Sequence, residues 1–173
     1  NRVLSNLTVV GKNNSYLGFG MDFQDFNNDG ITDWLVSAYK ASPYGQVEAG
    51  EVYIAYGPIN QTGVINITNI ADVTIYGQQG MISTNSGEGI GYFGLGNQGD
   101  LNGDGFTDVV VGGRAADPAW PLYNNSGVVY VLYNPSGNWP SEVNVSNANV
   151  TFINPAHNDL TGGWQVTGDV NLD

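Results

Sequence analysis

Two short segments of this sequence carry oxygen-bearing side chains at alternate positions, a spacing that suits a bound metal ion. The first is Asp25-Phe-Asn-Asn-Asp-Gly-Ile-Thr-Asp33, and the second is Asp100-Leu-Asn-Gly-Asp-Gly-Phe-Thr-Asp108. Calcium takes about six to eight oxygen ligands in a flexible cage, whereas zinc prefers His and Cys, which both segments lack. The pattern therefore predicts a calcium site in each segment.

The predicted ligands are alternate side chains, one backbone carbonyl and a closing aspartate. They are Asp25, Asn27, Asp29, the Ile31 carbonyl and Asp33 in the first segment, Asp100, Asn102, Asp104, the Phe106 carbonyl and Asp108 in the second, and Asp169, Asn171 and Asp173 in a partial third copy. Gly30 and Gly105 are expected to take a left-handed conformation at the bend. A single copy would fit a plain hairpin turn nearly as well, but the repetition favours metal binding.

The segments around these loops also repeat, and the repetition predicts the fold. Tyr53 precedes Val73 by 20 residues, and Tyr130 precedes Val150 by the same distance. Each full unit offers a Gly-rich aromatic strand, a hydrophobic strand after the acidic loop, a strand that alternates around tyrosine, and a Val-Thr-Ile/Phe strand. Four antiparallel strands per repeat form the blade of a β-propeller, whereas a β-sandwich needs no near-identical units.

The fold expected is therefore all-β, with two complete propeller-type blades and a partial third in an incomplete ring. The predicted boundaries are an N-terminal strand segment at 1–15, a first blade at 16–77, a linker at 78–90, a second blade at 91–154 and the start of a third blade at 155–173. Propellers close with about four to eight blades, so two and a fraction cannot close a ring.

The N-terminal segment is expected to complete the third blade. Leu7-Thr-Val-Val-Gly11 is similar to Val109-Val-Val-Gly-Gly113, the hydrophobic strand that follows the second loop. Residues 1–12 could play that part in the same molecule or in the next copy, and the second arrangement would grow a head-to-tail filament. The other interpretation is that the chain is a fragment.

Charge and composition limit the kinds of partner that this chain can bind and indicate the compartment in which it acts. The net charge of −12 and the 4 Lys and Arg residues make a nucleic-acid partner improbable, since phosphate contacts need basic side chains. No apolar run is long enough to insert into a membrane. Seven Asn-x-Ser/Thr sequons favour a secreted glycoprotein, at Asn6, Asn13, Asn60, Asn66, Asn124, Asn144 and Asn149. Asn-rich turns in a bacterial protein are the alternative.

The order of Gly-rich aromatic strand, acidic loop and hydrophobic strand resembles the FG-GAP repeat of integrin α-subunits. Phe93-Gly94 is the clearest match to the "FG" pair, whereas Ser37-Ala38 and Gly112-Gly113 are degenerate forms of the "GAP" portion. The resemblance covers most of residues 16–173. It implies calcium-binding propeller blades and, by analogy alone, a role in adhesion.

Three functions stay open on these residues. The first is a non-enzymatic adhesion or structural glycoprotein whose partners are other protein subunits, including copies of itself. The second is a lectin that stacks carbohydrate on Trp120, Tyr123 and Trp139, although packing in the core is the commoner role for tryptophan. The third is an enzyme of this fold, but His157 is the sole histidine and stands without a nucleophile motif.

Overall fold

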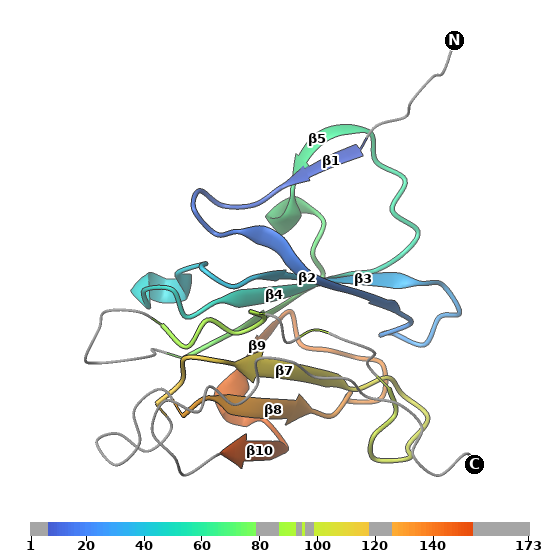
Figure 1. Ribbon diagram of the computed structural model, residues 1–173. Coiled ribbons are helices and arrows are strands. Elements are labelled where there is room, and N and C mark those ends of the chain that lie inside the picture. Colours follow the sequence, from blue (N-terminus) through green and yellow to red (C-terminus); the bar gives the residue numbers. More distant parts are fainter. Residues whose placement is uncertain (1–6, 79–86, 93–94, 96–98, 118–125, 154–173) are drawn as a thin grey trace.

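The computed structural model of this chain describes residues 7–78, 87–92, 95, 99–117 and 126–153, and short β-strands dominate these ranges (Figure 1). The strands are β1 (Leu7–Val10), β2 (Leu17–Gln24), β3 (Asp33–Ala38), β4 (Glu51–Ala55), β5 (Gly63–Asn66), β6 (Val73–Tyr76), β7 (Val109–Gly113), β8 (Val128–Leu132), β9 (Glu142–Asn144) and β10 (Val150–Ile153). Single turns of 3-10 helix follow at η1 (Pro43–Gly45), η2 (Ile67–Asn69) and η3 (Val145–Asn147). The all-β prediction is confirmed.

The first unit forms the predicted blade of four antiparallel strands. β2 pairs with β3, β3 with β4, and β4 with β6, so the strands lie side by side in chain order. Every residue of β4 is buried. A strand in the middle of a sheet that is covered on both faces reads as a continuous apolar run, which explains Val52-Tyr-Ile-Ala55.

The second unit repeats this order with β7, β8 and β10 in one antiparallel sheet. A Gly-rich aromatic strand was predicted to precede β7. Isolated bridges join Ile90 to Gly113 and Gly99 to Asp108 on either side of that segment. Part of the segment itself, including Phe93-Gly94, lies outside the described residues.

Two short strands were not predicted from the sequence. β9 lies inside 135–147, which was expected to be a connecting segment, and it pairs in parallel with β6 of the first unit. β5 lies between the third and fourth strands of the first unit and pairs in parallel with β1. These strands have three and four residues, too few to show a period. Their partners are distant in the sequence, so the local pattern does not reveal them.

The N-terminal segment differs in its pairing from the prediction. The similarity of Leu7–Gly11 to Val109–Gly113 suggested the second strand of a third blade. In the structure β1 instead forms a two-stranded sheet with β5 beside the first unit. Residues 154–173 lie outside the described part of the chain, so completion of a third blade stays a prediction.

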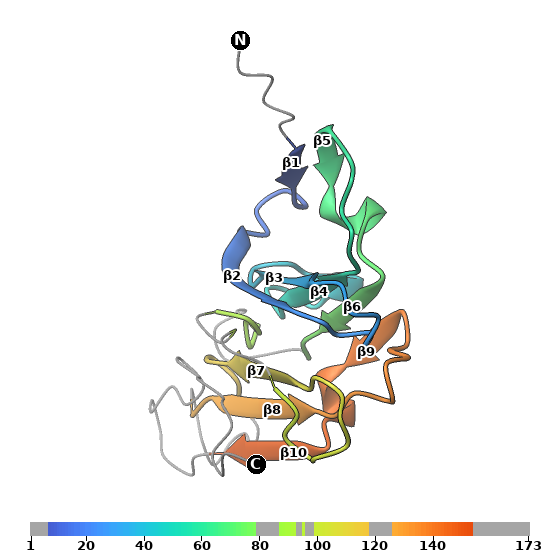
Figure 2. The same cartoon turned by 90° about the vertical axis from the view of Figure 1, so that its right-hand side faces the viewer.

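The two units face each other across a shared hydrophobic core. Figure 2 shows the layers in order: β1 with β5, then the sheet of the first unit, then the sheet of the second. Val52 and Ile54 of β4 belong to the same buried cluster as Val109 and Val111 of β7. A second cluster on the opposite face of the first sheet joins Tyr53 to Ile67, with Val9 of β1 packed against it. Each sheet therefore buries its faces only by stacking, as repeat proteins do.

Candidate metal centre

The two acidic loops occupy equivalent places in the two units. The first connects β2 to β3, and the second leads into β7 at the same end of its sheet. Gly30 and Gly105 have φ angles of +83° and +90°, which confirms the predicted left-handed bend. Asn28 and Gly103 also have positive φ, at 60° and 78°. Two left-handed positions in a short loop fold it back on its first aspartate.

The first aspartate of each loop accepts hydrogen bonds from the same two backbone positions, and Asp100 also accepts one from the N–H of Gly103 at 2.7 Å. Asp25 accepts from the backbone N–H groups of Asp29 and Gly30 at 3.1 and 2.8 Å. Asp100 accepts from the equivalent groups of Asp104 and Gly105 at 3.1 and 2.7 Å. These N–H groups, with that of Gly105 first, lower the pKa of Asp100 below its usual value. The first aspartate of each loop therefore organises the backbone that follows it.

The middle of each loop is held in the same way. Asp29 accepts from the N–H of Ile31 at 2.8 Å, and Asp104 accepts from the N–H of Phe106 at 3.0 Å. The amide of Asn27 donates to Asp29 at 3.0 Å, and Asn102 donates to Asp104 at 2.9 Å. The side chains of each loop thus hold its own backbone in place. Asp and Asn side chains that bond nearby backbone groups in this way favour a loop over a helix or strand.

The closing aspartates have a different environment, because Asp33 and Asp108 are fully buried. The two carboxylate oxygens of Asp33 accept from the N–H groups of Phe26 and Gly57, each at 2.8 Å. Asp108 accepts from Leu101 and Asn134 at the same distance. Burial raises the pKa of both aspartates, and the backbone bonds oppose that shift. Each one ties its loop to the segment after the third strand.

The donor chemistry of the loops fits a hard cation, although the side chains do not yet converge on one. Asp25 and Asn27 are half-buried and Asp29 is exposed. Within the ranges that the structure describes, no three His, Cys, Asp or Glu side chains gather around a common centre. The carboxylates bond backbone N–H groups instead. The third predicted set, Asp169, Asn171 and Asp173, lies outside the described residues.

One side chain that the sequence analysis missed joins the two loops. Asn134, which follows β8, is buried between them. Its amide donates to the Phe26 carbonyl at 2.8 Å and to the Thr107 carbonyl at 3.1 Å, while its own oxygen accepts from the N–H of Gly137 at 2.7 Å. A recurring X-Pro pair after the third strand, at Gly57 and Asn134, is the available sequence signal. Asn134 couples the ends of the two units.

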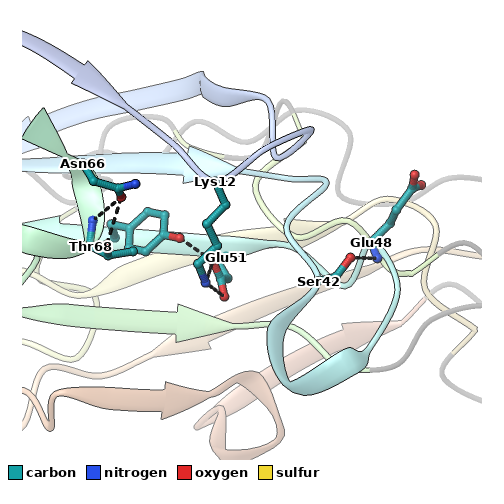
Figure 3. A network of polar contacts seen from close by, with 7 residues as sticks. Lys12, Ser42, Glu48, Glu51, Asn66 and Thr68 are labelled. Carbon is teal, nitrogen blue, oxygen red and sulfur yellow. Dashed lines mark hydrogen bonds and ion pairs between the residues drawn. The ribbon is translucent and has the colours of Figure 1, made fainter. Parts of the chain in front are cut away.

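Buried carboxylates form a second type of polar anchor, at the opposite end of the third strands. Glu51 on β4 accepts from the Tyr53 hydroxyl and makes an ion pair with Lys12, whose Nζ lies 2.7 Å away (Figure 3). In the second unit, Glu88 accepts from the Tyr130 hydroxyl at 2.8 Å and from the backbone N–H of Gln78. Burial raises the pKa of Glu88 to about 7. No sequence motif pointed to these groups.

The remaining predicted residues fall into three groups. Trp139 is half-buried and packs against the shared core, which is the commoner role of tryptophan. Asn13, Asn60 and Asn149 are exposed, whereas Asn66 and Asn144 cap η2 and η3 through their side-chain oxygens. Asn6, Trp120, Tyr123, Asn124 and His157 lie outside the described residues. Glycosylation and carbohydrate binding stay predictions.

Comparisons with known proteins identify one repeat and one distant relative. Residues 98–132 match the FG-GAP repeat, a span that includes the second loop, β7 and β8. The chain is also similar to a phosphatidylinositol-glycan-specific phospholipase D from Dictyostelium discoideum, with 27% identity over 187 aligned positions. That alignment covers 98% of this chain and 18% of the relative, so the chain spans less than a fifth of the relative's length. The predicted FG-GAP resemblance is confirmed.

We expect Asn134→Ala to lower the free energy of unfolding by about 1–3 kcal/mol, because it leaves buried carbonyl and N–H groups without partners. Asn138→Ala is the matched control, since that exposed amide makes one bond to the Ser136 carbonyl. Urea denaturation of both variants measures the difference. Equal stability of the two variants would show that Asn134 does not couple the loops.

The pKa of Glu88 predicts a loss of stability as the pH rises. An acid whose pKa lies near 7 in the folded state and near 4.5 when unfolded binds more protons when folded. The free energy of unfolding should therefore fall between about pH 4.5 and pH 7, by roughly 3 kcal/mol at most. Urea denaturation at several pH values in this range measures the free energy of unfolding as a function of pH. This free energy should fall less steeply with pH for Glu88→Gln than for the parent chain. Glu48→Gln serves as the more exposed control.

Proposed function

We propose that this chain is a non-enzymatic, extracellular, calcium-stabilised glycoprotein module with an adhesion or structural role. The observation that carries the proposal is the repetition of one oxygen-rich loop with the same internal hydrogen bonds in both units. FG-GAP repeats occur in extracellular and cell-surface proteins, which supports the compartment. The exposed sequons at Asn13, Asn60 and Asn149 support glycosylation.

Calcium would be held by Asp25, Asn27 and Asp29 in the first loop and by their equivalents in the second, with the carbonyls of Ile31 and Phe106 as further ligands. The ion would supply positive charge that offsets the clustered carboxylates. The chain itself supplies the frame. Asp33 and Asp108 stay bonded to the backbone, and the left-handed glycines keep the loop folded back. The expected effect is a rigid edge at one end of the stacked sheets.

The opposite end of the sheets is the better candidate for contact with a partner. A cavity of about 290 Å³ opens there, after the ends of β3 and β7, and its lining includes Tyr39, Glu48, Glu88 and Tyr92. The rings of Tyr39 and Tyr92 lie 4.5 Å apart, and Phe19, exposed in part, packs on both at 4.8 Å. Aromatic side chains that remain partly exposed are typical anchors of protein interfaces. We assign adhesive contacts to this rim.

A second candidate function follows from the distant relative. The phospholipase D matches this chain along almost its whole length, over a small part of its own. The same module could therefore belong to a larger enzyme and position it, without catalysing the reaction itself. Turnover by the isolated chain would contradict both candidates.

Self-association is a further part of the proposal, because β10 ends the second sheet in the described part of the chain. Phe152 and Ile153 on this strand are 57% and 48% exposed. β6 holds the same position in the first unit and is covered by β9. An outer strand with exposed apolar side chains is a site where a further strand can add. Head-to-tail copies would use this edge.

Calcium should raise the melting temperature of the purified chain, and a chelator should reverse the effect. Binding to the folded state alone adds about 2.7 kcal/mol at a calcium concentration of 100 times Kd. For a chain of this size each kcal/mol corresponds to about 2–4 °C. Asp29→Asn combined with Asp104→Asn should abolish the shift, whereas Asp72→Asn, outside the loops, should keep it. Titration calorimetry supplies the independent binding measurement, and an unchanged melting temperature would refute the structural role of calcium.

Sedimentation velocity should detect larger species as the protein concentration rises, if copies associate through the β10 edge. Replacing Phe152 and Ile153 by Lys on this edge should shift the distribution back to monomer, since charge disfavours strand addition. Val64→Lys, at an exposed position of β5, is the control. A single monomer peak for the parent chain at high concentration would rule out the filament.

A further inference from the structure

The pairing of β1 with β5 repeats the pairing of β6 with β9. Both are parallel, and both match residue by residue: Thr8 lies opposite Val64 as Thr74 lies opposite Glu142. Two positions later Val10 lies opposite Asn66, and Tyr76 lies opposite Asn144. These two asparagines cap η2 and η3 in the same way. Because β6 is the fourth strand of the blade before β9, the register gives β1 the same position relative to β5.

The polar anchors show the same equivalence. The residue two positions after β6 is Gln78, and its N–H donates to Glu88, which also accepts from Tyr130 of the third strand. The residue two positions after β1 is Lys12, and its ammonium group pairs with Glu51, which accepts from Tyr53 (Figure 3). In each unit a buried carboxylate thus bonds a tyrosine of the third strand. The same carboxylate also bonds the residue two positions after the strand of the neighbouring layer, β6 in one case and β1 in the other.

The layers agree with this assignment. β9 is an edge strand of the first sheet, and Val143 of β9 and Val145 of η3 belong to the core that the two units share. β5 and η2 lie on the opposite face of the first sheet, next to β1 (Figure 2). We propose that β1 is the fourth, outer strand of another FG-GAP blade, and that its second edge takes the third strand of that blade in antiparallel pairing. β1 has no other strand partner in the part of the chain that the structure describes. The segment thus presents a docking edge.

The chemistry of the docking strand follows from the two blades in hand. Thr74 of β6 lies opposite Tyr53, and Thr151 of β10 lies opposite Tyr130. The residues on either side of each of these tyrosines are aliphatic. Thr8 is the equivalent residue of β1, so the strand that docks there carries tyrosine opposite Thr8 with aliphatic neighbours. Cross-strand pairs of this kind set the register of a sheet.

A second copy of the described units does not supply this strand. β4 is paired with β3 and β6, and β8 is paired with β7 and β10, so both third strands have their two edges occupied. The occupant is therefore a blade other than the two described. Docking at β1 requires neither calcium nor an adhesive role.

Disulfide trapping tests the proposal, because the chain contains no cysteine. The full chain with Thr8→Cys is mixed with a synthetic peptide of residues 50–56, extended by lysines for solubility and carrying cysteine at the position of Tyr53. Directly opposite residues on antiparallel strands lie within the Cα separation that a disulfide spans. Docking raises the local peptide concentration, so the adduct yield should exceed that of an undocked cysteine by about tenfold.

The controls use positions where the edge is already filled. Thr74→Cys lies on β6, which pairs with β4 on one edge and with β9 on the other, and it should give only the background yield. A peptide with cysteine at the position of Ile54 should also fail with Thr8→Cys, because a shift of one residue turns the side chain to the other face. Circular dichroism checks that each variant is folded.

Two outcomes would overturn the proposal. Equal yields for Thr8→Cys and Thr74→Cys would show that β1 offers no special edge. Rapid formation of a disulfide-linked dimer of the Thr8→Cys chain without peptide would show that a second copy, pairing β1 with β1, is the occupant. Protection of β1 amides from hydrogen exchange on addition of the cysteine-free peptide would provide independent support.

Discussion

Each unit depends on a buried aspartate at the start of its second strand. Asp33 and Asp108 each bond with both oxygens, one to the acidic loop and one to the chain that leaves the third strand. A buried carboxylate is costly unless its oxygens are satisfied, so these contacts cannot vary independently. The loop, the second strand and the third strand are thereby fixed relative to one another. Because the aspartate bonds a residue near the start of the acidic loop, the loop must fold back on itself, and the Asp-Gly turns and glycine bends allow this.

The stacking of sheets adds a second constraint, because neither unit buries its faces alone. The shared core brings Ile54 of one unit against the valines of the next, and Asn134 holds the two loops at one end. At the other end, Glu88 receives donors from both units, through Gln78 and Tyr130. Apolar contact thus supplies the bulk of the association, and polar contacts at the two ends fix the alignment.

Much of the blade could be predicted from the sequence, because its signals are local. Repetition at fixed spacing located seven of the strands, and the loop motif located Gly30 and Gly105 at their left-handed bends. The contacts between units could not be found in this way. β5 and β9 are too short to show a pattern, and Asn134 looks like any turn asparagine until its partner Phe26 is known. The parallel pairing of β1 with β5 was not foreseen either, because the apolar run of β1 does not reveal its partner.

The parallel seam between β6 and β9 has a consequence for how such units succeed one another. Here adjacent blades are joined by main-chain hydrogen bonds as well as by side chains. Main-chain pairing fixes the step and rotation between neighbours more tightly than side-chain packing does, and substitutions leave it intact. In a longer array of such units, the rotation from one blade to the next would therefore be constrained by the strand that lies between the third and fourth strands. Sequence drift in the core can proceed while the pitch from one blade to the next stays constant.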